Sequence, residues 1–344
     1  MNKRVAIILV FFLLYAFFVQ NRVWGQQSAE QEEINELTIY VIPSHLYVNW
    51  DSPSTLYKTT ALSWFYAKFH KYSYGVGHLF IELNTPLLKE PIMTSIRSTG
   101  NKEKKRMILK DKVGLGLIGA AMPGRMESRE ELSASIDYNV KKDREIAFIK
   151  YRINRSAALR IIEYINGFTQ KGADSIAPCD FYGGGFWPRY EKEGAGCSSF
   201  GIVAMDVAGL KIDYPEWIHS VNIPSELLGG EFNKFRKVMI SKIERSRTWY
   251  KGDGAANVDY FPFFIYDPTL IYDWIMKQRD SLASGTGKSS NQFIPEEKKQ
   301  GRGTIPGLYM DASSIAAPED PIFTKRKERS VFVDCFFNSR FFYK

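Results

Sequence analysis

Cysteine and histidine are scarce in this chain of 344 residues. The histidines stand at positions 45, 70, 78 and 219, and the cysteines at 179, 197 and 335. Three cysteines are too few for a framework of disulfides, and their odd number leaves one thiol unpaired even in an oxidising compartment. His45 and His70 lie in polar or aromatic surroundings more typical of surface residues than of metal ligands. The sequence predicts no bound metal.

A long apolar run is also missing. The longest, Val5–Val19, has 15 residues and follows Lys3 and Arg4. A membrane span needs about 20 apolar residues, so the pattern favours a cleaved signal peptide over an anchor, with cleavage after Gly25. No cysteine follows the run, which excludes lipidation there. We expect residues 1–25 to be removed and the protein to be periplasmic or extracellular, without a membrane span.

The chain lacks a coherent basic patch. Its net charge of +8 falls to +5 once Lys3, Arg4 and Arg22 leave with the signal peptide. Apart from two short clusters at 102–106 and 325–327, the basic residues are dispersed. Nucleic-acid binding requires a larger continuous positive surface, so we expect no nucleic-acid partner.

Two glycine-rich stretches fall short of nucleotide-binding motifs. Gly114–Gly119 has the letters of the dinucleotide fingerprint, but Pro123 and Gly124 follow where a helix would be required. Residues 285–289 have the end of a phosphate-binding loop, but Leu282 stands at the position of its first glycine. The sequence predicts no cofactor.

In the stretch Gly194–Phe200, the glycines end just where an apolar helical pattern begins. The period places Cys197 at the start of a helix that runs to about Leu210, with Gly209 as its stop. A thiol in a first turn faces free backbone N–H groups and the positive end of the helix dipole, which favour the thiolate. Cys197 is therefore a candidate nucleophile, and its alternative role is that of a small buried apolar residue.

His78 stands at the entrance of a predicted strand, behind two glycines. We expect this strand to continue to Leu83 and to form a hairpin with a return strand at Ile92–Arg97. Pairing then brings Ser95 or its neighbours opposite His78, and alternation decides whether Thr94 or Ser95 shares its face. We choose Ser95 as the residue that orients the imidazole. Glu82 is its rival on grounds of charge, although it lies further along the strand. His219 is the weaker candidate for the base.

An aromatic, glycine-rich loop at 180–190 precedes the Cys197 helix. Tyr182, Trp187 and Tyr190 are well placed there to line a substrate groove, or alternatively to plug the core. Further strands are predicted at 37–42, 132–140, 145–153 and 330–337, helices at 54–71, 155–170, 231–247 and from Pro268, and a flexible loop at 281–303. The fold class is therefore α+β, an antiparallel sheet packed against helices.

The order of these motifs resembles the NlpC-like branch of the papain-like cysteine peptidases. In ordinary members the Cys helix precedes the His strand, whereas in the circularly permuted ones, which include lecithin–retinol acyltransferase-like proteins, the order is reversed. Here Gly77-His78 precedes Gly196-Cys197. The third family residue is usually His, Asn, Gln or Glu on the strand after the His strand, where this chain has Thr94, Ser95 and Arg97.

The resemblance implies a permuted papain-like catalytic core at 26–225 and a C-terminal extension at 226–344 that packs on it. It also implies an exported cysteine hydrolase that cleaves amide bonds of a cell-envelope substrate such as cell-wall peptide. Lipid acyl hydrolysis or transfer in the same fold is the alternative, and a non-catalytic binding module is another. If Cys197 is the nucleophile, we expect Cys179 and Cys335 either to pair or to be buried.

Overall fold

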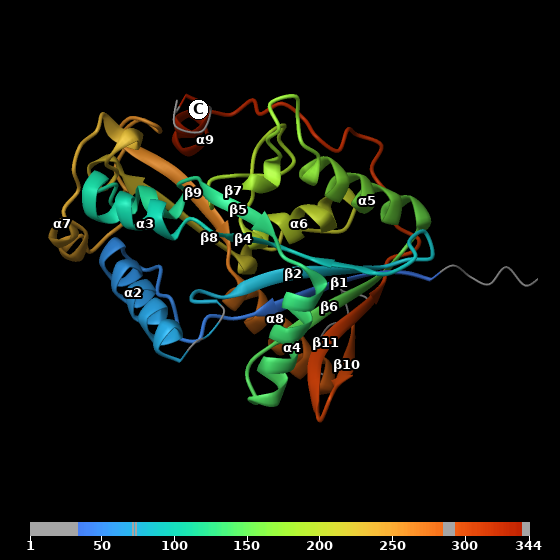
Figure 1. Cartoon of the computed structure of the whole chain (residues 1–344). Helices are drawn as coiled ribbons and strands as arrows, with labels where there is room; N and C mark the ends of the chain where they lie inside the picture. Colours follow the sequence, from blue (N-terminus) through green and yellow to red (C-terminus); the bar gives the residue numbers. More distant parts are fainter. Residues whose placement is uncertain (1–33, 71, 73, 285–292, 339–344) are drawn as a thin grey trace, which may run out of the picture. The chain divides into compact units, whose positions relative to one another are not determined.

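The computed structural model describes residues 34–70, 72, 74–284 and 293–338, and its α+β architecture confirms the predicted fold class. A six-stranded sheet lies at its centre, in the order β10-β11-β6-β1-β2-β3 (Figure 1). All neighbouring pairs are antiparallel except β11 and β6. The strands span Asn35–Ile42 (β1), His78–Asn84 (β2), Ile92–Thr94 (β3), Ala147–Ile153 (β6), Ile294–Gln300 (β10) and Gly303–Asp311 (β11).

Helices cover both faces of this sheet. Alternate residues of β1, such as Ile39 and Tyr40, are buried on opposite faces, which explains why the strand is apolar throughout. One face packs against α5, α6 and α8, and the other against α4 (Figure 1). The bounds are Arg129–Lys141 (α4), Arg155–Thr169 (α5), Cys197–Val207 (α6) and Pro268–Ala283 (α8).

The remaining elements surround one end of the sheet. Two smaller sheets have the orders β4-β5-β7 and β8-β9. Their strands are Ile96–Ser98 (β4), Met122–Met126 (β5), Phe181–Tyr182 (β7), Ile218–Pro224 (β8) and Tyr260–Tyr266 (β9). The helices beside them are Pro53–Phe69 (α2), Asn101–Arg106 (α3), Ile240–Arg245 (α7) and Val331–Asn338 (α9).

Several predicted elements are wrong. The expected strand at 132–140 is helix α4, because Ser128 and Glu131 form a reciprocal capping box that starts a helix. The expected strand at 330–337 is helix α9, and most of the expected helix at 231–247 is irregular apart from α7. The expected flexible loop at 281–303 contains the end of α8 and strand β10. The helices at 54–71, at 155–170, from Pro268 and from Cys197 are confirmed.

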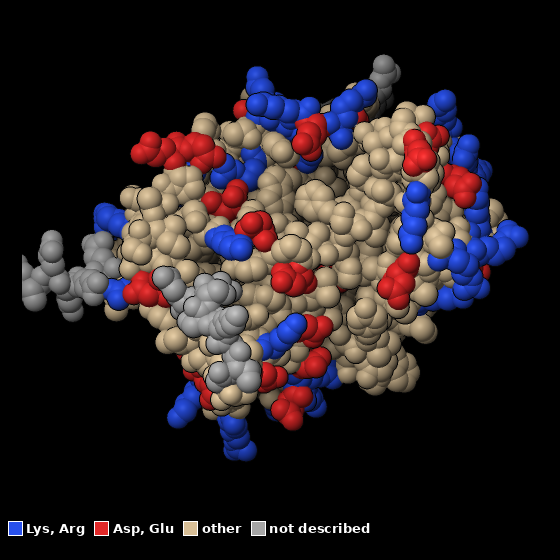
Figure 2. Space-filling model, turned by 180° about the vertical axis from the view of Figure 1, so that it is seen from behind, with Lys and Arg blue, Asp and Glu red and all other residues tan. Residues whose placement is uncertain are grey.

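Residues from Asn35 onward belong to one compact unit, in which the chain after position 225 adds β10 and β11 to the central sheet. The expected signal peptide lies outside the described residues. Among the described residues, no helix combines the length and apolar character needed to cross a membrane. On the face shown in Figure 2, basic side chains gather along one edge while the middle carries little charge.

The contact between α6 and β2 positions the two main candidate residues, Cys197 and His78. It is close because Gly201 of α6 faces Leu79 of β2, where an added Cβ atom would lie 2.1 Å from a Leu79 methyl carbon. Leu79 is fully buried and cannot move into solvent. The absence of a side chain at 201 therefore sets the distance between helix and strand.

We expect Gly201→Ala to lower the free energy of unfolding by about 2 kcal/mol or more, although alanine is the better helix former, because the overpacking outweighs a gain of about 1 kcal/mol in propensity. Urea unfolding would measure the loss. Gly75→Ala is the matched control, because its Cβ would lie no closer than 3.4 Å to any neighbour. Equal stability of the two variants would contradict the close-contact argument.

Candidate active site

Cys197 is the first residue of α6, and the chain before it is held tightly. The amide of Gly196 donates to Ser199 Oγ over 2.9 Å, which caps the helix start. A Cβ atom at Gly194 would lie 2.1 Å from the carbonyl oxygen of Phe181, so only glycine fits there. The Cys197 side chain is buried. Its place at the first position of α6 is as predicted.

His78 begins β2, and its side chain is buried. Gly77 before it has a φ of +82°, a conformation that glycine adopts without strain. The imidazole stacks on the ring of Tyr74, with centroids 3.8 Å apart and planes at 12°. Its charge also interacts with that of Cys197, and each of the two residues shifts the pKa of the other. The structure therefore brings together the predicted nucleophile and base.

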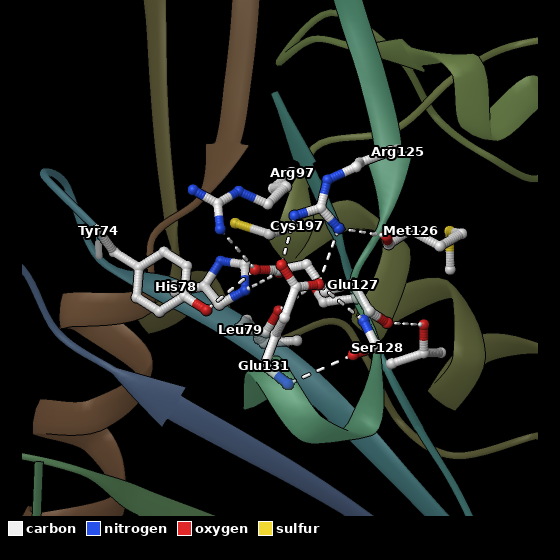
Figure 3. A network of polar contacts seen from close by, with 12 residues as sticks. Tyr74, His78, Leu79, Arg97, Arg125, Met126, Glu127, Ser128, Glu131 and Cys197 are labelled. Carbon is white, nitrogen blue, oxygen red and sulfur yellow. Dashed lines mark hydrogen bonds and ion pairs between the residues drawn. The ribbon is translucent and has the colours of Figure 1, made fainter. Parts of the chain in front are cut away.

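The residue that orients His78 is Glu127 (Figure 3). Its Oε2 lies 2.6 Å from His78 Nε2, which leaves Nδ1 as the nitrogen that faces Cys197. The hydroxyl of Tyr74 donates to Glu127 Oε1 over 3.0 Å, and the Arg97 guanidinium lies 3.6 Å from the same oxygen. Both carboxylate oxygens are thus engaged, although the side chain is buried. This network fixes the imidazole in one orientation.

The choice of Ser95 as orienting residue is wrong. The return strand ends at Thr94, and the chain then leaves the central sheet to form β4. Ser95 lies at this break, and its hydroxyl donates to the carbonyl of Leu79 over 2.6 Å. The rival Glu82 also points elsewhere, because it accepts hydrogen bonds from Tyr40 and Lys298.

Sequence reasoning missed Glu127 because strand β5, which directly precedes it, was not predicted. Glu127 directly follows β5 and precedes the N-cap Ser128 of α4, in a segment to which we assigned neither a strand nor a helix. The capping box Ser128–Glu131 was a readable signal for the helix start. The backbone holds Glu127 in place, since its amide donates to the Ser95 carbonyl and its carbonyl accepts from Thr94 Oγ1.

The charges of the three residues stabilise one another. Burial alone raises the pKa of Cys197, but the His78 imidazolium beside it and the Leu79 amide outweigh burial and lower it. Burial alone lowers the pKa of His78, but the thiolate and Glu127 raise it to about 9. Burial likewise opposes ionisation of Glu127, whose pKa nevertheless falls because His78, Tyr74 and Arg97 favour the carboxylate. The arrangement favours a thiolate–imidazolium pair at neutral pH.

Tyr182 also contacts the sulfur of Cys197. Its hydroxyl donates to Cys197 Sγ over 3.9 Å. The negative charge of the thiolate is the main reason why the pKa of Tyr182 is raised well above its usual value, and burial adds to it. Tyr182 therefore stays protonated and remains a hydrogen-bond donor beside the reacting atom.

A pocket of about 850 Å³ adjoins Cys197. Tyr182, Trp187 and Tyr190, the three predicted substrate-binding residues, all line it. Trp187 stacks on Tyr266, and Arg326 covers the ring of Tyr190 while it forms two hydrogen bonds to the buried carboxylate of Glu193. The wall is largely apolar and includes Val48, Trp50, Leu56, Ile118, Phe263 and Phe332.

The other candidate residues lie apart from this chemistry. His219 pairs with Asp267 over 3.2 Å and stacks on Trp50. Cys179 and Cys335 are free and half-buried, so the expectation that they pair or are buried is wrong. Gly114–Gly119 forms a turn and the short 3₁₀ helix Leu115–Ile118. The described part of the chain contains no cluster of His, Cys, Asp and Glu that could hold a metal ion.

Comparisons of the chain with protein-family models, curated proteins and solved structures find no match. The chemistry of the site is therefore argued from its own geometry.

We expect Cys197 to react selectively with iodoacetamide at pH 6. The neighbouring His78 lowers the pKa of Cys197, whereas burial raises the pKa of Cys179 to about 11 and that of Cys335 to about 12. Peptide mass mapping after timed labelling measures the three rates. In the His78→Ala variant the rate at Cys197 should fall about 100-fold, because the thiol then returns towards its ordinary pKa. Equal labelling of all three cysteines would contradict an activated Cys197.

We expect Glu127→Gln to lower the pKa of His78 from about 9, because the amide removes the negative charge but keeps the shape. Titration of the imidazole by NMR measures the shift, and labelling of Cys197 at pH 6 should slow at least about tenfold. Ser95→Ala is the control. It should cost about 1 kcal/mol of stability through the lost bond to Leu79 and leave the His78 titration unchanged. The reverse result would restore Ser95 as the orienting residue.

Proposed function

We propose that this protein is a cysteine hydrolase that cleaves an amide or ester bond through an acyl-enzyme. The observation that carries the proposal is the buried row Cys197–His78–Glu127 beside an apolar pocket of about 850 Å³. A nucleophile, a base and an orienting acid in hydrogen-bonded order are what thiol acyl transfer requires. The order of His78 before Cys197 also agrees with the resemblance to permuted papain-like enzymes.

The first half-reaction uses the thiolate directly. Cys197 Sγ attacks the substrate carbonyl carbon, and the carbonyl oxygen gains negative charge. The N–H of Cys197 and the dipole of α6 stabilise this oxygen, as in other oxyanion holes. The His78 imidazolium then gives its Nδ1 proton to the leaving amine or alcohol, which departs and leaves a thioester on Cys197.

The second half-reaction releases the acyl group. Neutral His78 takes a proton from water at Nδ1, and the resulting hydroxide attacks the thioester carbonyl. Sulfur leaves as the thiolate, so the initial ion pair is restored. Glu127 holds Nε2 throughout and stabilises the positive charge on the ring each time it forms.

Two substrate classes fit a site of this kind. The resemblance favours an amide bond of cell-wall peptide, met by an exported enzyme. The apolar wall formed by Val48, Leu56 and Phe332 favours the second class, a lipid acyl bond whose chain lies along these residues. A non-catalytic binding module is the remaining alternative, and it is the one that an inert Cys197 in the labelling experiment would support.

We expect Cys197→Ala and His78→Ala each to reduce turnover of a p-nitrophenyl acyl ester by at least about 1000-fold, because thiolate and imidazolium act as one unit. His219→Ala is the control and should retain most of the turnover. In the parent protein, mass spectrometry after rapid acid quenching should detect the acyl group on Cys197. Full turnover in the His78 variant would refute the proposed mechanism.

The rate should depend on pH with two limbs. The rate falls at acid pH because Cys197 becomes protonated. The midpoint of this acid limb lies below the ordinary thiol pKa of about 8.5, because the pKa of Cys197 is lowered. The rate falls again above about pH 9, where His78 loses the proton that the leaving group needs. Measurements of kcat/KM from pH 5 to 10 test this profile. A rate that rises steadily to pH 10 would indicate a thiol without an imidazolium partner.

A further inference from the structure

Helix α2 buries small side chains and exposes large apolar ones, the reverse of what is usual for a helix packed on a protein core. Its buried positions include the small residues Ser63 and Ala67. Leu62, Phe65 and Phe69 follow one another at helical spacing and are 60%, 63% and 83% exposed. A helix that only packs against the body would place such side chains inward. This exposed row, together with the neighbouring Tyr66, is called the α2 face below.

Other aromatic residues border the α2 face. Trp64 is exposed and packs edge to face against Phe65. The ring of Tyr72 contacts both Tyr66 and His45, and the exposed Leu46 and Tyr47 directly follow His45. Figure 1 shows α2 at the periphery of the fold, next to α7. Exposed apolar side chains of this size and continuity mark an interaction surface.

The charges on the helix point to the kind of partner. Residues 53–69 contain Lys58 and Lys68 but no aspartate or glutamate. Both lysines are exposed, and the Lys68 ammonium lies 5.3 Å from the centre of the Trp64 ring. Lysines beside Trp, Tyr, Phe and Leu are the composition of helices that lie in the interface of an anionic bilayer.

We propose that the α2 face binds the surface of an anionic lipid bilayer. The apolar row enters the boundary between headgroups and acyl chains, and Lys58 and Lys68 contact the anionic headgroups. This binding does not depend on catalysis, so it stands or falls apart from the proposed hydrolase function.

The position of α2 gives the binding a consequence for the site. Leu56 and Thr60 of the same helix line the pocket beside Cys197, as does Val76, which is also exposed. The α2 face and the pocket wall are therefore built on one helix. By helical spacing the α2 face lies on the opposite side of α2 from Leu56 and Thr60, so a bilayer bound there would lie near the pocket without lining it.

The test is sedimentation of the protein without its expected signal peptide, residues 26–344, with sucrose-loaded vesicles. Vesicles of phosphatidylglycerol and phosphatidylcholine in equal parts should bind the parent protein, and added salt should weaken the binding. The double variant Phe65→Ser and Phe69→Ser should lose at least about tenfold in partitioning, because two large apolar groups no longer enter the interface. Lys58→Glu with Lys68→Glu should weaken binding to these vesicles but much less to pure phosphatidylcholine.

Leu159→Ser is the control, because Leu159 is 48% exposed and belongs to α5, which lies on the opposite side of the fold from α2 (Figure 1). It should bind vesicles like the parent. Cys197→Ala should also bind unchanged, which separates docking from catalysis. The double phenylalanine variant should retain labelling of Cys197 at pH 6, which shows that the fold is intact. Absence of vesicle binding by the parent, or a stable dimer by light scattering that the double variant abolishes, would overturn the proposal.

Discussion

The hydrogen bond between His78 and Glu127 is the interaction on which the site depends. It lies in the interior, where an unpaired carboxylate would be strongly unfavourable, and removal of one partner of such a pair typically costs about 3–5 kcal/mol. Tyr74 and Arg97 satisfy the other carboxylate oxygen, so the charge is tolerated. The negative charge of Glu127 acts on the Cys197 thiol indirectly. It keeps the His78 imidazole between them protonated, and this positive ring stabilises the thiolate.

Packing around this hydrogen bond comes from elements that are distant in sequence. β2 supplies His78, the segment after β5 supplies Glu127, and α6 supplies Cys197. The close contact of Gly201 with Leu79 and the tight turn at Gly194 place the sulfur beside the imidazole. Gly194, Gly201 and the buried Glu127 therefore determine whether Cys197 and His78 act as a reactive pair.

Local patterns in the sequence were sufficient for Cys197 and His78. Glycines directly before a helical period, or before a strand, are signals contained within about ten residues, and the structure pairs the two segments. Glu127 could not be found in this way, because the hairpin partner of β2 ends at Thr94 and the chain crosses to another sheet. Helix α4 was missed because its capping box, Ser128 with Glu131, was not used as a helix start. Helix α9 was missed because its aromatic and β-branched residues are typical of strands.

The wall of the pocket includes Arg326 and Phe332, which follow Cys197 by more than 120 residues. All parts of the reactive row lie before position 198, whereas these two side chains belong to a segment held to the body by the ion pair with Glu193. Substitutions in that late segment can reshape what enters the pocket without touching the residues that break bonds. The residues that react thus lie before position 198, and part of the pocket wall that selects the substrate lies in the segment with Arg326 and Phe332. Substitutions can therefore change substrate selectivity while reactivity is retained.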